Sequence, residues 1–287
     1  MPTQHFQRIA ILGTGLIGGS FGLAVRRALP AARVVGWDRP AVLQAAATRG
    51  AVELGISDLP RAVSGADLVY VALPIGVTLD LLPEIARHAG PGALVTDACS
   101  VKAPIERAAR EQFRAEARFL GGHPLAGKET GGIEHADGDL FRGARYALAG
   151  ARDGADARVG SFAQLVAAIG AEPVWLSPEE HDRAVALISH LPQLVAVALA
   201  GTLREATDDT GLPLTLAGPG ARDSLRLAGS PYALWRDICL TNRENTSDAL
   251  NRLGQAIEHL RANLASRELE HEFDAANEVY KILRQMK

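Results

Sequence analysis

The sequence contains little cysteine and little excess charge. Cys99 and Cys239 are the only cysteines in 287 residues, too few for a disulfide framework or a cysteine-built metal site, and no metal site is predicted. The 30 Lys and Arg residues nearly balance the 33 Asp and Glu residues, which leaves a formal net charge of -3. So small a charge gives no general reason to expect nucleic acid or an anionic membrane as a partner.

Targeting and membrane-spanning signals are also missing. The N-terminus, MPTQHFQRIAILG, lacks the charged start, long apolar run and cleavage site of a signal peptide. No apolar run is long enough to cross a bilayer without a charge or a helix breaker, so we expect a cytoplasmic protein. The length predicts one or two domains, and 47% hydrophobic and 22% charged residues are ordinary for a soluble globular chain.

A glycine fingerprint near the N-terminus predicts a dinucleotide site. Residues 8–12, RIAIL, are typical of a buried parallel strand, and Gly13, Gly15 and Gly18 in the following GTGLIGGS fit the pattern G-x-G-x-x-G. Gly13 permits the tight turn, Gly15 lets the backbone approach a pyrophosphate, and Gly18 lets the next helix pack on the strand. Leu16 and Ile17 lie inside the fingerprint and are assigned to the cofactor with it.

An acidic residue at the end of the next strand bears on the choice of cofactor. Residues 33–37 form the second strand candidate, and Asp38 follows 20 residues after Gly18, a spacing at which a carboxylate meets a ribose 2′-hydroxyl. Asp38 favours NAD, because a carboxylate repels a 2′-phosphate. Arg39 beside it keeps NADP open, since arginine can pair with that phosphate.

Apolar runs that alternate with helical patterns predict an α/β fold with a Rossmann-type, doubly wound parallel sheet. Further strands are expected at residues 67–73, 94–97, 117–120, 145–149 and 172–176, and helices at 20–29, 77–88, 102–112 and 155–169, with a break at Pro83. Ligands bind beyond the carboxyl ends of such strands. Pro74, Ser100 and His123 follow three strands and are expected to share one cleft, with Pro74 beside the cofactor.

The pattern changes at Ser177, where SPEE predicts a capping box and the start of an all-helical region. We therefore expect a dinucleotide-binding domain at residues 1–176 and a helical substrate and dimerisation domain at 177–287. Pro192 is expected to kink the first long helix. Amphipathic helices expected at 232–265 and 267–286 suit either a homodimer interface or the closing of their own domain.

Five motifs, in order, resemble the prephenate/arogenate dehydrogenase family of tyrosine biosynthesis. They are GTGLIGGS, DACSVK, GGHPLAGKETGG, EEHDRAVALISHLPQ and ARDSLRLAGSPYALWRDICLTNRENT. The resemblance implies NAD-dependent oxidative decarboxylation of prephenate to 4-hydroxyphenylpyruvate. Arogenate as the substrate and NADP as the cofactor stay open, since the family's prephenate enzymes often read SHLPH where this chain has Gln193.

The resemblance also implies roles for individual residues. His123 is the catalytic base that accepts the proton of the ring hydroxyl, and Ser100 hydrogen-bonds that hydroxyl. Substrate-binding residues follow from the same match: Arg226 for a carboxylate, Glu129 near the entrance, Lys128 as an attracting cation, and His190, Gln193 and Trp235 near the pocket.

Two other functions compete with this interpretation. A β-hydroxyacid dehydrogenase would use a lysine on a helix of its second domain, and the helical half here has only Lys281 and Lys287. A non-catalytic nicotinamide sensor would need no proton acceptor such as His123. We expect the remaining histidines, His181 among them, to be surface or packing residues, and Asp237 to serve local hydrogen bonding.

Overall fold

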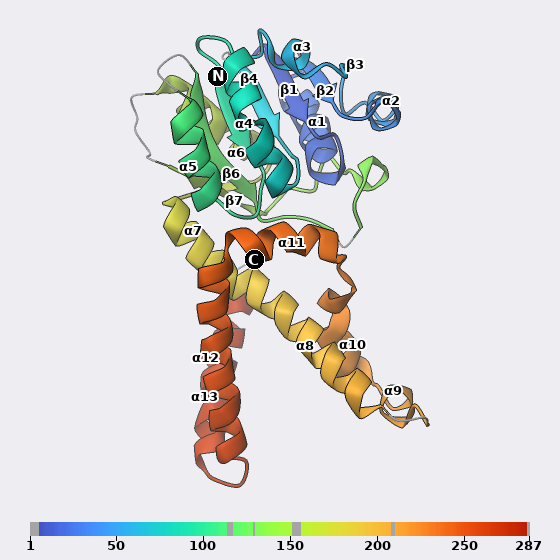
Figure 1. Cartoon of the computed structure of the whole chain (residues 1–287), viewed down its shortest axis with the longest axis vertical. Coiled ribbons are helices and arrows are strands. Elements are labelled where there is room, and N and C mark those ends of the chain that lie inside the picture. The colour runs from blue at the N-terminus through green and yellow to red at the C-terminus, as the bar shows by residue number, and fades with distance from the viewer. Residues whose placement is uncertain (1–5, 114–116, 129, 151–155, 208–209, 286–287) are drawn as a thin grey trace.

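The computed structural model describes residues 6–113, 117–128, 130–150, 156–207 and 210–285. An eight-stranded sheet flanked by helices occupies the N-terminal half, and helices alone form the C-terminal half below it (Figure 1). The strands are β1 Arg8–Leu12, β2 Arg33–Trp37, β3 Leu54–Gly55, β4 Leu68–Val71, β5 Leu94–Asp97, β6 Arg118–Pro124, β7 Arg145–Ala149 and β8 Glu172–Leu176.

Helices α1 to α6 belong to the sheet domain. They are α1 Leu16–Ala28, α2 Pro40–Thr48, α3 Leu59–Val63, α4 Ile75–His88, α5 Ala103–Gln112 and α6 Ala157–Ala168, with the short 3-10 helix η1 at Ile133–His135. The C-terminal helices are α7 Pro178–Val185, α8 Leu191–Ala206, α9 Leu212–Thr215, α10 Pro219–Leu225, α11 Tyr232–Thr241, α12 Arg243–Ala262 and α13 Glu268–Gln285, with the π-helical turn η2 at Ala186–His190 and the 3-10 turn η3 at Arg226–Gly229.

The sheet is buried on both faces, as its continuous apolar strands predict. Side chains alternate along β1, so Ile9 and Ile11 join one apolar cluster while Ala10 and Leu12 join the other. The strand order β3-β2-β1-β4-β5-β6-β7-β8 reverses next to β1. Beyond the carboxyl end of β1 the glycine loop therefore faces the crevice in which open α/β sheets bind their ligands.

The sheet is mostly parallel, but the expectation of a wholly parallel sheet is wrong at one place. Strand β7 pairs antiparallel with β6, and β8 then runs parallel to β7. A parallel return needs a crossover, usually a helix. The described residues between β6 and β7 hold only the short η1, so the chain turns back beside the strand it has left.

Strand β6 is also longer than expected, and His123 lies within it rather than in a loop. Residues Arg118 to Leu120 pair with β5, and the next four residues pair with β7 instead. Gly122 allows this close passage, because a Cβ there would meet the backbone oxygen of Asp97 at 2.6 Å. His123 thus sits on a hydrogen-bonded strand, which holds its backbone in place.

Several helix boundaries differ from expectation. Helix α1 begins at Leu16, directly after the glycine loop. Helix α4 continues through the exposed Pro83, so the expected break there is wrong. The helix expected at 232–265 is two helices divided at Asn242, whose side chain donates a hydrogen bond to the backbone oxygen of Asp182 at 2.8 Å. The kink expected at Pro192 stays a prediction, and the π-helical turn η2 ends just before that proline.

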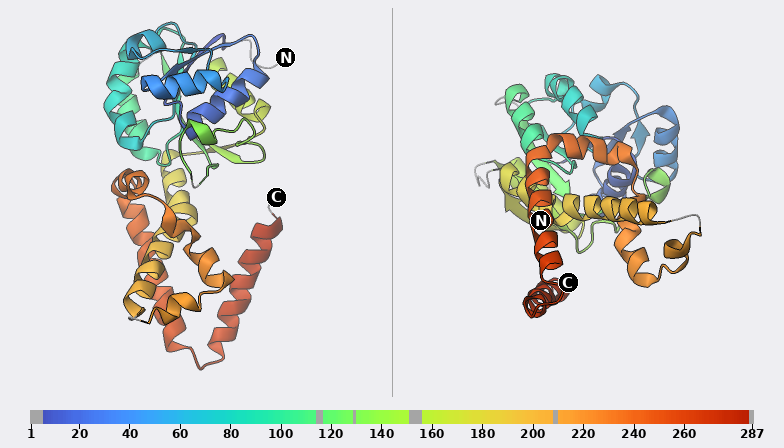
Figure 2. Two further views of the ribbon diagram at one scale, coloured as in Figure 1. Left: turned by 90° about the vertical axis from the view of Figure 1, so that its right-hand side faces the viewer. Right: turned by 60° about the horizontal axis from the view of Figure 1, so that its bottom comes forward.

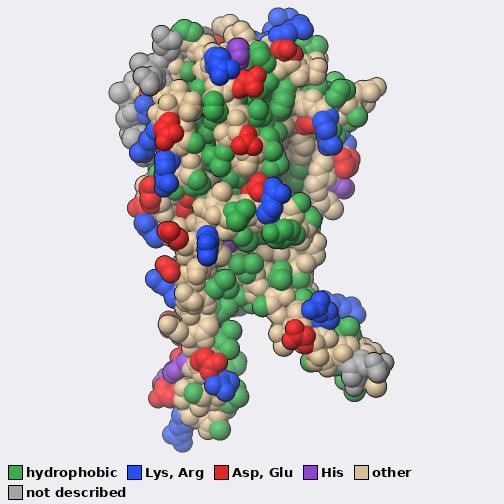
Figure 3. Space-filling view, in the orientation of Figure 1, with side chains coloured by type: hydrophobic (Ala, Val, Ile, Leu, Met, Phe, Trp, Pro, Cys, Tyr) green, Lys and Arg blue, Asp and Glu red, His purple; other side chains and the backbone are tan. Residues whose placement is uncertain are grey.

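The helical half exposes much apolar surface. Helices α12 and α13 form a V (Figure 2), and hydrophobic side chains gather where the helical arms diverge (Figure 3). The continuous helical segment Pro178–Ala206 has 29 residues and a mean hydropathy of 1.8 in its most apolar stretch, so by length and composition alone it could also cross a membrane. It carries the buried polar residues His190 and Gln193, which suits a protein interface better than lipid.

Candidate active site

A cleft of about 600 Å³ lies between the carboxyl ends of the strands and helix α11. Its lining includes residues of both domains, with Asp237 and Ile238 contributed by α11. Six of the predicted site residues line it: Gly15, Leu16, Ile17, Pro74, Ser100 and Lys128. The structure thus brings the predicted cofactor loop and part of the predicted substrate site to one place. The expectation that His123 shares this cleft with Pro74 and Ser100 is wrong, because His123 is not among the lining residues.

The glycine loop has the geometry that a pyrophosphate needs. Gly13 has a φ of +88°, and a Cβ there would meet the Ala72 oxygen at 2.3 Å. A Cβ on Gly18 would lie 1.9 Å from the Gly13 oxygen, so the helix can approach the strand only with glycine there. Gly15 has no atom within 4 Å of its Cβ position, which leaves room for a ligand. No side chain of the described chain caps α1 at Gly15, so its first N–H groups can bind an anion.

Asp38 lies beside this loop, at the end of β2. Its carboxylate accepts hydrogen bonds from the backbone N–H of Thr14 at 2.8 Å and of Arg39 at 2.7 Å. The Arg39 side chain is 86% exposed, and its Nε lies 4.0 Å from Asp38. The residues present fit a dinucleotide, because the Asp38 carboxylate is held where it could accept a hydrogen bond from a ribose hydroxyl.

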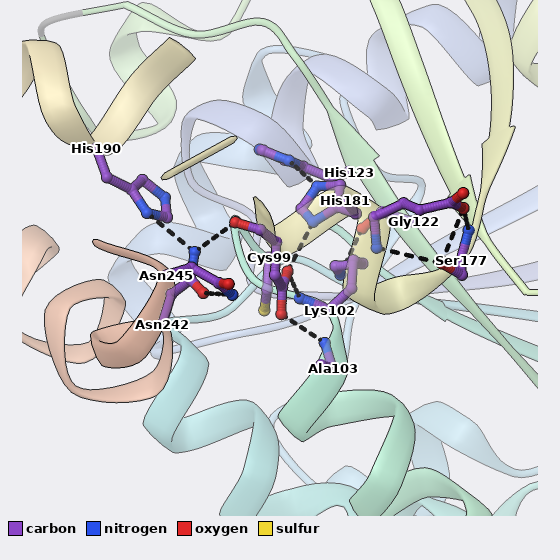
Figure 4. Close-up of polar contacts among 12 residues, drawn as sticks. Cys99, Lys102, Ala103, Gly122, His123, Ser177, His181, His190, Asn242 and Asn245 are labelled. Carbon is purple, nitrogen blue, oxygen red and sulfur yellow. Dashed lines mark hydrogen bonds and ion pairs between the residues drawn. The ribbon is translucent and has the colours of Figure 1, made fainter. Parts of the chain in front are cut away.

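His123 is hydrogen-bonded to the helical domain through a chain of two side chains (Figure 4). Its Nδ1 lies 2.9 Å from Nε2 of His181, and Nδ1 of His181 lies 2.8 Å from Oδ1 of Asp182. Asp182 is itself held by the first turn of α5, because its carboxylate accepts hydrogen bonds from the backbone N–H groups of Lys102 at 2.7 Å and Ala103 at 2.8 Å. Both His181 and Asp182 are buried.

This chain determines where the proton on His123 sits. An ionised carboxylate only accepts hydrogen bonds, so a neutral His181 donates from Nδ1 to Asp182 and accepts at Nε2. His123 must then donate from Nδ1, which leaves a lone pair on its Nε2. Burial is the main cause that lowers the pKa of His123 well below the ordinary histidine value, and the Lys102 ammonium acts in the same direction. His123 is therefore a neutral proton acceptor at neutral pH.

The expectation that His181 is only a surface or packing residue is wrong. It is 1% exposed and lies 58 residues from its partner His123. In the sequence, only the neighbouring Glu180 and Asp182 suggested a role for His181, and they do not indicate that it would bond to His123. The other histidines of that group lie outside this chain of hydrogen bonds, and His5 lies outside the described residues.

A buried ion pair holds the strand ends that carry Ser100 and His123. Lys102 and Asp97 are 1% and 0% exposed and in direct contact. Asp97 also accepts the N–H groups of Cys99 at 3.0 Å and Gly122 at 3.1 Å, and the Lys102 ammonium donates to the Gly122 oxygen at 2.7 Å. These additional bonds offset part of the desolvation cost of a buried pair, and they tie the end of β5 to β6.

Ser100 faces the cleft. It is partly exposed, and its hydroxyl makes no hydrogen bond to another described residue. A ligand hydroxyl in the cleft can therefore reach it.

His190 and Trp235 form a second group, in the helical domain. Nδ1 of His190 accepts a hydrogen bond from the Asn242 amide at 3.2 Å, so its proton is on Nε2. That nitrogen and the indole nitrogen of Trp235 are buried without a partner among the described residues. The two rings are perpendicular, with centroids 5.9 Å apart. Burial lowers the pKa of His190 to about 4, so it is neutral.

The remaining predicted substrate residues are spread out. The Gln193 amide donates to the Leu227 oxygen at 2.8 Å, which places it beside η3, where Arg226 is exposed. Neither Gln193 nor Arg226 lines the cleft. Lys128 lines it, but its ammonium binds the His135 oxygen at 3.1 Å and Asp137 at 3.3 Å. Glu129 lies outside the described residues.

Comparison with known proteins identifies the family. Residues 21–175 match the nucleotide-binding domain of prephenate dehydrogenase, and residues 177–283 match its dimerization domain. The chain is 31% identical over 278 residues to the prephenate dehydrogenase of Lactococcus lactis, covering 95% of this chain and 76% of that one. It is 32% identical over 273 residues to the enzyme of Bacillus subtilis, covering 94% and 73%.

Solved structures agree with these matches. Prephenate dehydrogenase from A. aeolicus, in complex with hydroxyphenyl propionate and NAD+, superposes with a TM-score of 0.87 at 29% identity over 97% of each chain. Arogenate dehydrogenase from Synechocystis gives a TM-score of 0.83 at 28% identity over 96% of this chain and 99% of that one. With both domains matched in sequence and in structure, the chain belongs to the prephenate dehydrogenase family.

Proposed function

We propose that this protein is an NAD-dependent prephenate dehydrogenase, which converts prephenate to 4-hydroxyphenylpyruvate and carbon dioxide in tyrosine biosynthesis. The observation that carries the proposal is the neutral His123, whose Nε2 is left as a proton acceptor by its bond to His181. The names of the relatives and the NAD+ bound in the A. aeolicus enzyme support it.

The residues divide the work of oxidation and proton removal. The loop from Gly13 to Gly18 and Asp38 hold the dinucleotide, which, when bound, accepts the hydride from the ring carbon that bears the hydroxyl. Nε2 of His123 takes the hydroxyl proton as that C–H bond breaks. The imidazolium that forms is stabilised by Asp182 through His181, and Ser100 orients the substrate hydroxyl.

Decarboxylation completes the reaction. The bond from the ring to its carboxylate breaks as carbon dioxide leaves, and its electron pair enters the ring, which becomes aromatic. Aromatisation makes the reaction effectively irreversible. The protein's task is therefore to align the hydride and remove one proton, and no second acid or base is required.

Substrate recognition is assigned to polar groups around the cleft. We assign a substrate carboxylate to Arg226, with Lys128 and Glu129 at the entrance. His190 and Trp235 each offer a buried, unpartnered N–H donor in the helical domain. Such donors are costly to leave unpaired, and a bound substrate oxygen would satisfy them.

Arogenate is the second candidate, and Gln193 is compatible with both substrates. Its amide nitrogen donates one hydrogen bond to the Leu227 oxygen, which leaves the second N–H and the amide oxygen. The oxygen can accept a hydrogen bond from the ammonium of arogenate, and the N–H can donate to the keto group of prephenate. The similar Synechocystis structure is that of an arogenate dehydrogenase.

We also propose a cytoplasmic homodimer with a dinucleotide-binding domain at 1–176 and a substrate and dimerisation domain at 177–287. Support comes from the dimerization-domain match at 177–283 and from the exposed apolar side chains of the helical half. Strand β8 ends at Leu176 and α7 begins at Pro178.

The test is reduced-cofactor absorbance with purified protein, offered prephenate or arogenate, each with NAD or NADP. Turnover of prephenate with NAD, lost in His123→Asn and kept in the remote control His88→Asn, would support the proposal. Turnover of arogenate alone would move the assignment to the second candidate. Binding of cofactor with no turnover in any mixture would refute an enzyme and leave a sensor.

A further inference from the structure

Asp237, expected to serve local hydrogen bonding, instead joins the two domains. Its Oδ2 accepts a hydrogen bond from the backbone N–H of Gly76 at 3.0 Å, across 161 residues of sequence. Its Oδ1 accepts one from Nε of Arg236 at 2.9 Å. Gly76 is the second residue of α4, so a carboxylate of α11 occupies the N-terminus of a helix in the nucleotide-binding domain.

The contact is tight and its charge is favourable. A Cβ on Gly76 would lie 3.0 Å from Oδ2 of Asp237, so only glycine lets the carboxylate approach without displacement. The guanidinium of Arg236 and the Gly76 N–H lower the pKa of Asp237. The ionised carboxylate faces the positive end of the α4 dipole.

Apolar packing next to this bond joins the same two helices. Ile238 is 5% exposed and belongs to the apolar cluster that contains Ile75 and Leu82 of α4, and Trp235 packs against that cluster. Helix α11 lies directly across the end of the nucleotide-binding domain (Figure 1). Asp237 is therefore the polar part of a docking contact.

Two aspartates of the helical domain bind the N-terminus of a helix in the nucleotide-binding domain. Asp182 binds the N-terminus of α5 and supports the hydrogen-bond chain to His123. Asp237 binds the N-terminus of α4 and supports no catalytic side chain. It does line the cleft, together with Pro74 and Gly15 of the cofactor-binding side.

We propose that Asp237 is a positioning residue that fixes α11 against α4 and so sets the width of the cleft in which the cofactor binds. Asp182 serves proton transfer, and Asp237 serves cofactor affinity. The inference rests on the proposed function for the identity of the cofactor, and its effect appears in binding rather than in the chemical step.

The test compares Asp237→Ala and Asp237→Asn with Asp58→Ala. Asp58 is a matched control, since it caps α3 by accepting the Arg61 N–H at 2.9 Å without lining the cleft. Loss of a hydrogen bond to a charged group predicts about a tenfold rise in the KM for NAD for Asp237→Ala. The value of kcat should change much less, because the chain from His123 to Asp182 is intact. Asp237→Asn should recover part of the loss, since its amide oxygen can still accept the Gly76 N–H.

Direct titration with NADH, followed by its fluorescence, separates this test from the proposed function, because binding is measured even without turnover of prephenate. Weaker NADH binding in Asp237→Ala than in wild type and Asp58→Ala supports the proposal. Unchanged NADH affinity, or a fall in kcat at constant KM, overturns it. If Asp237→Ala does not fold, the same comparison with Asp237→Asn decides, with an expected smaller loss of NADH affinity.

Discussion

Replacing His181 by leucine should lower kcat by about two orders of magnitude and change KM little. The leucine removes the acceptor of the His123 Nδ1–H, a hydrogen bond that contributes ~1 kcal/mol to keeping the reactive tautomer. It also separates the forming imidazolium from the Asp182 carboxylate, and a hydrogen-bonded charged partner contributes ~2 kcal/mol. Together these amount to ~3 kcal/mol in the transition state, or about a hundredfold in rate.

His181→Gln is the matched variant. Its side-chain oxygen can still accept the Nδ1–H of His123, so kcat should fall less than in His181→Leu. The assay is initial-rate formation of reduced cofactor at saturating prephenate and NAD, with folding checked by thermal unfolding because residue 181 is buried. A kcat for His181→Leu within about twofold of the wild type would refute the reasoning about the tautomer, since general bases typically supply ~10²–10⁴-fold.

The pH profile tests the same hydrogen-bond chain independently. Burial and neighbouring charges hold the pKa of His123 well below its ordinary value. Nearly all of His123 is thus deprotonated at neutral pH, and kcat should fall only in acid, at a pH below about 6.5. An acid limb at or above the ordinary histidine value would contradict the assignment of His123 as a base that is neutral at neutral pH.

Three further predictions concern the cofactor loop, acid stability and assembly. Gly15→Val should keep the melting temperature but weaken NADH binding, because its Cβ enters the open space of the cleft, whereas Gly18→Ala should lower the melting temperature through contact with the Gly13 oxygen at 1.9 Å. The pKa of His190 is about 4 in the folded protein and ~6.5 in the unfolded chain, so the unfolded chain binds protons more strongly. Urea unfolding should therefore show that the free energy of unfolding falls by ~3 kcal/mol from pH 6.5 to pH 4. The variant His190→Gln should show a smaller fall. The double variant Phe273→Asp, Leu283→Asp alters two α13 side chains that are each 64% exposed, and light scattering should show monomers in place of dimers.

The cofactor loop was predictable because its requirements are local. Gly13 and Gly18 are required because a Cβ at either position would clash with nearby backbone, and Gly15 leaves space for a ligand. All three lie within one strand–turn–helix unit. Seven of the eight strands followed equally from short apolar runs, and the two-residue strand β3 was missed. Binary patterns do not encode strand direction, however, so the antiparallel pairing of β7 could not be read from the sequence.

The site was predictable only in part, for the same physical reason. His123 stood out by its motif, but its extended backbone depends on pairing with β7, which is distant in sequence. The partnership with His181 depends on how the helical domain docks on the sheet. The assigned contact of Arg226 with a substrate carboxylate stays a prediction, since Arg226 is exposed on η3 and does not line the cleft.

The hydrogen bond between His123 and His181 joins a strand of one domain to a helix of the other. Helix α7 is also fixed to the sheet domain, because Asp182 accepts the backbone N–H groups of Lys102 and Ala103. The position of α7 therefore determines whether His181 is in place to accept the Nδ1–H of His123. A substitution that shifts α7 should lower the rate of proton removal even when it changes no residue that touches the substrate.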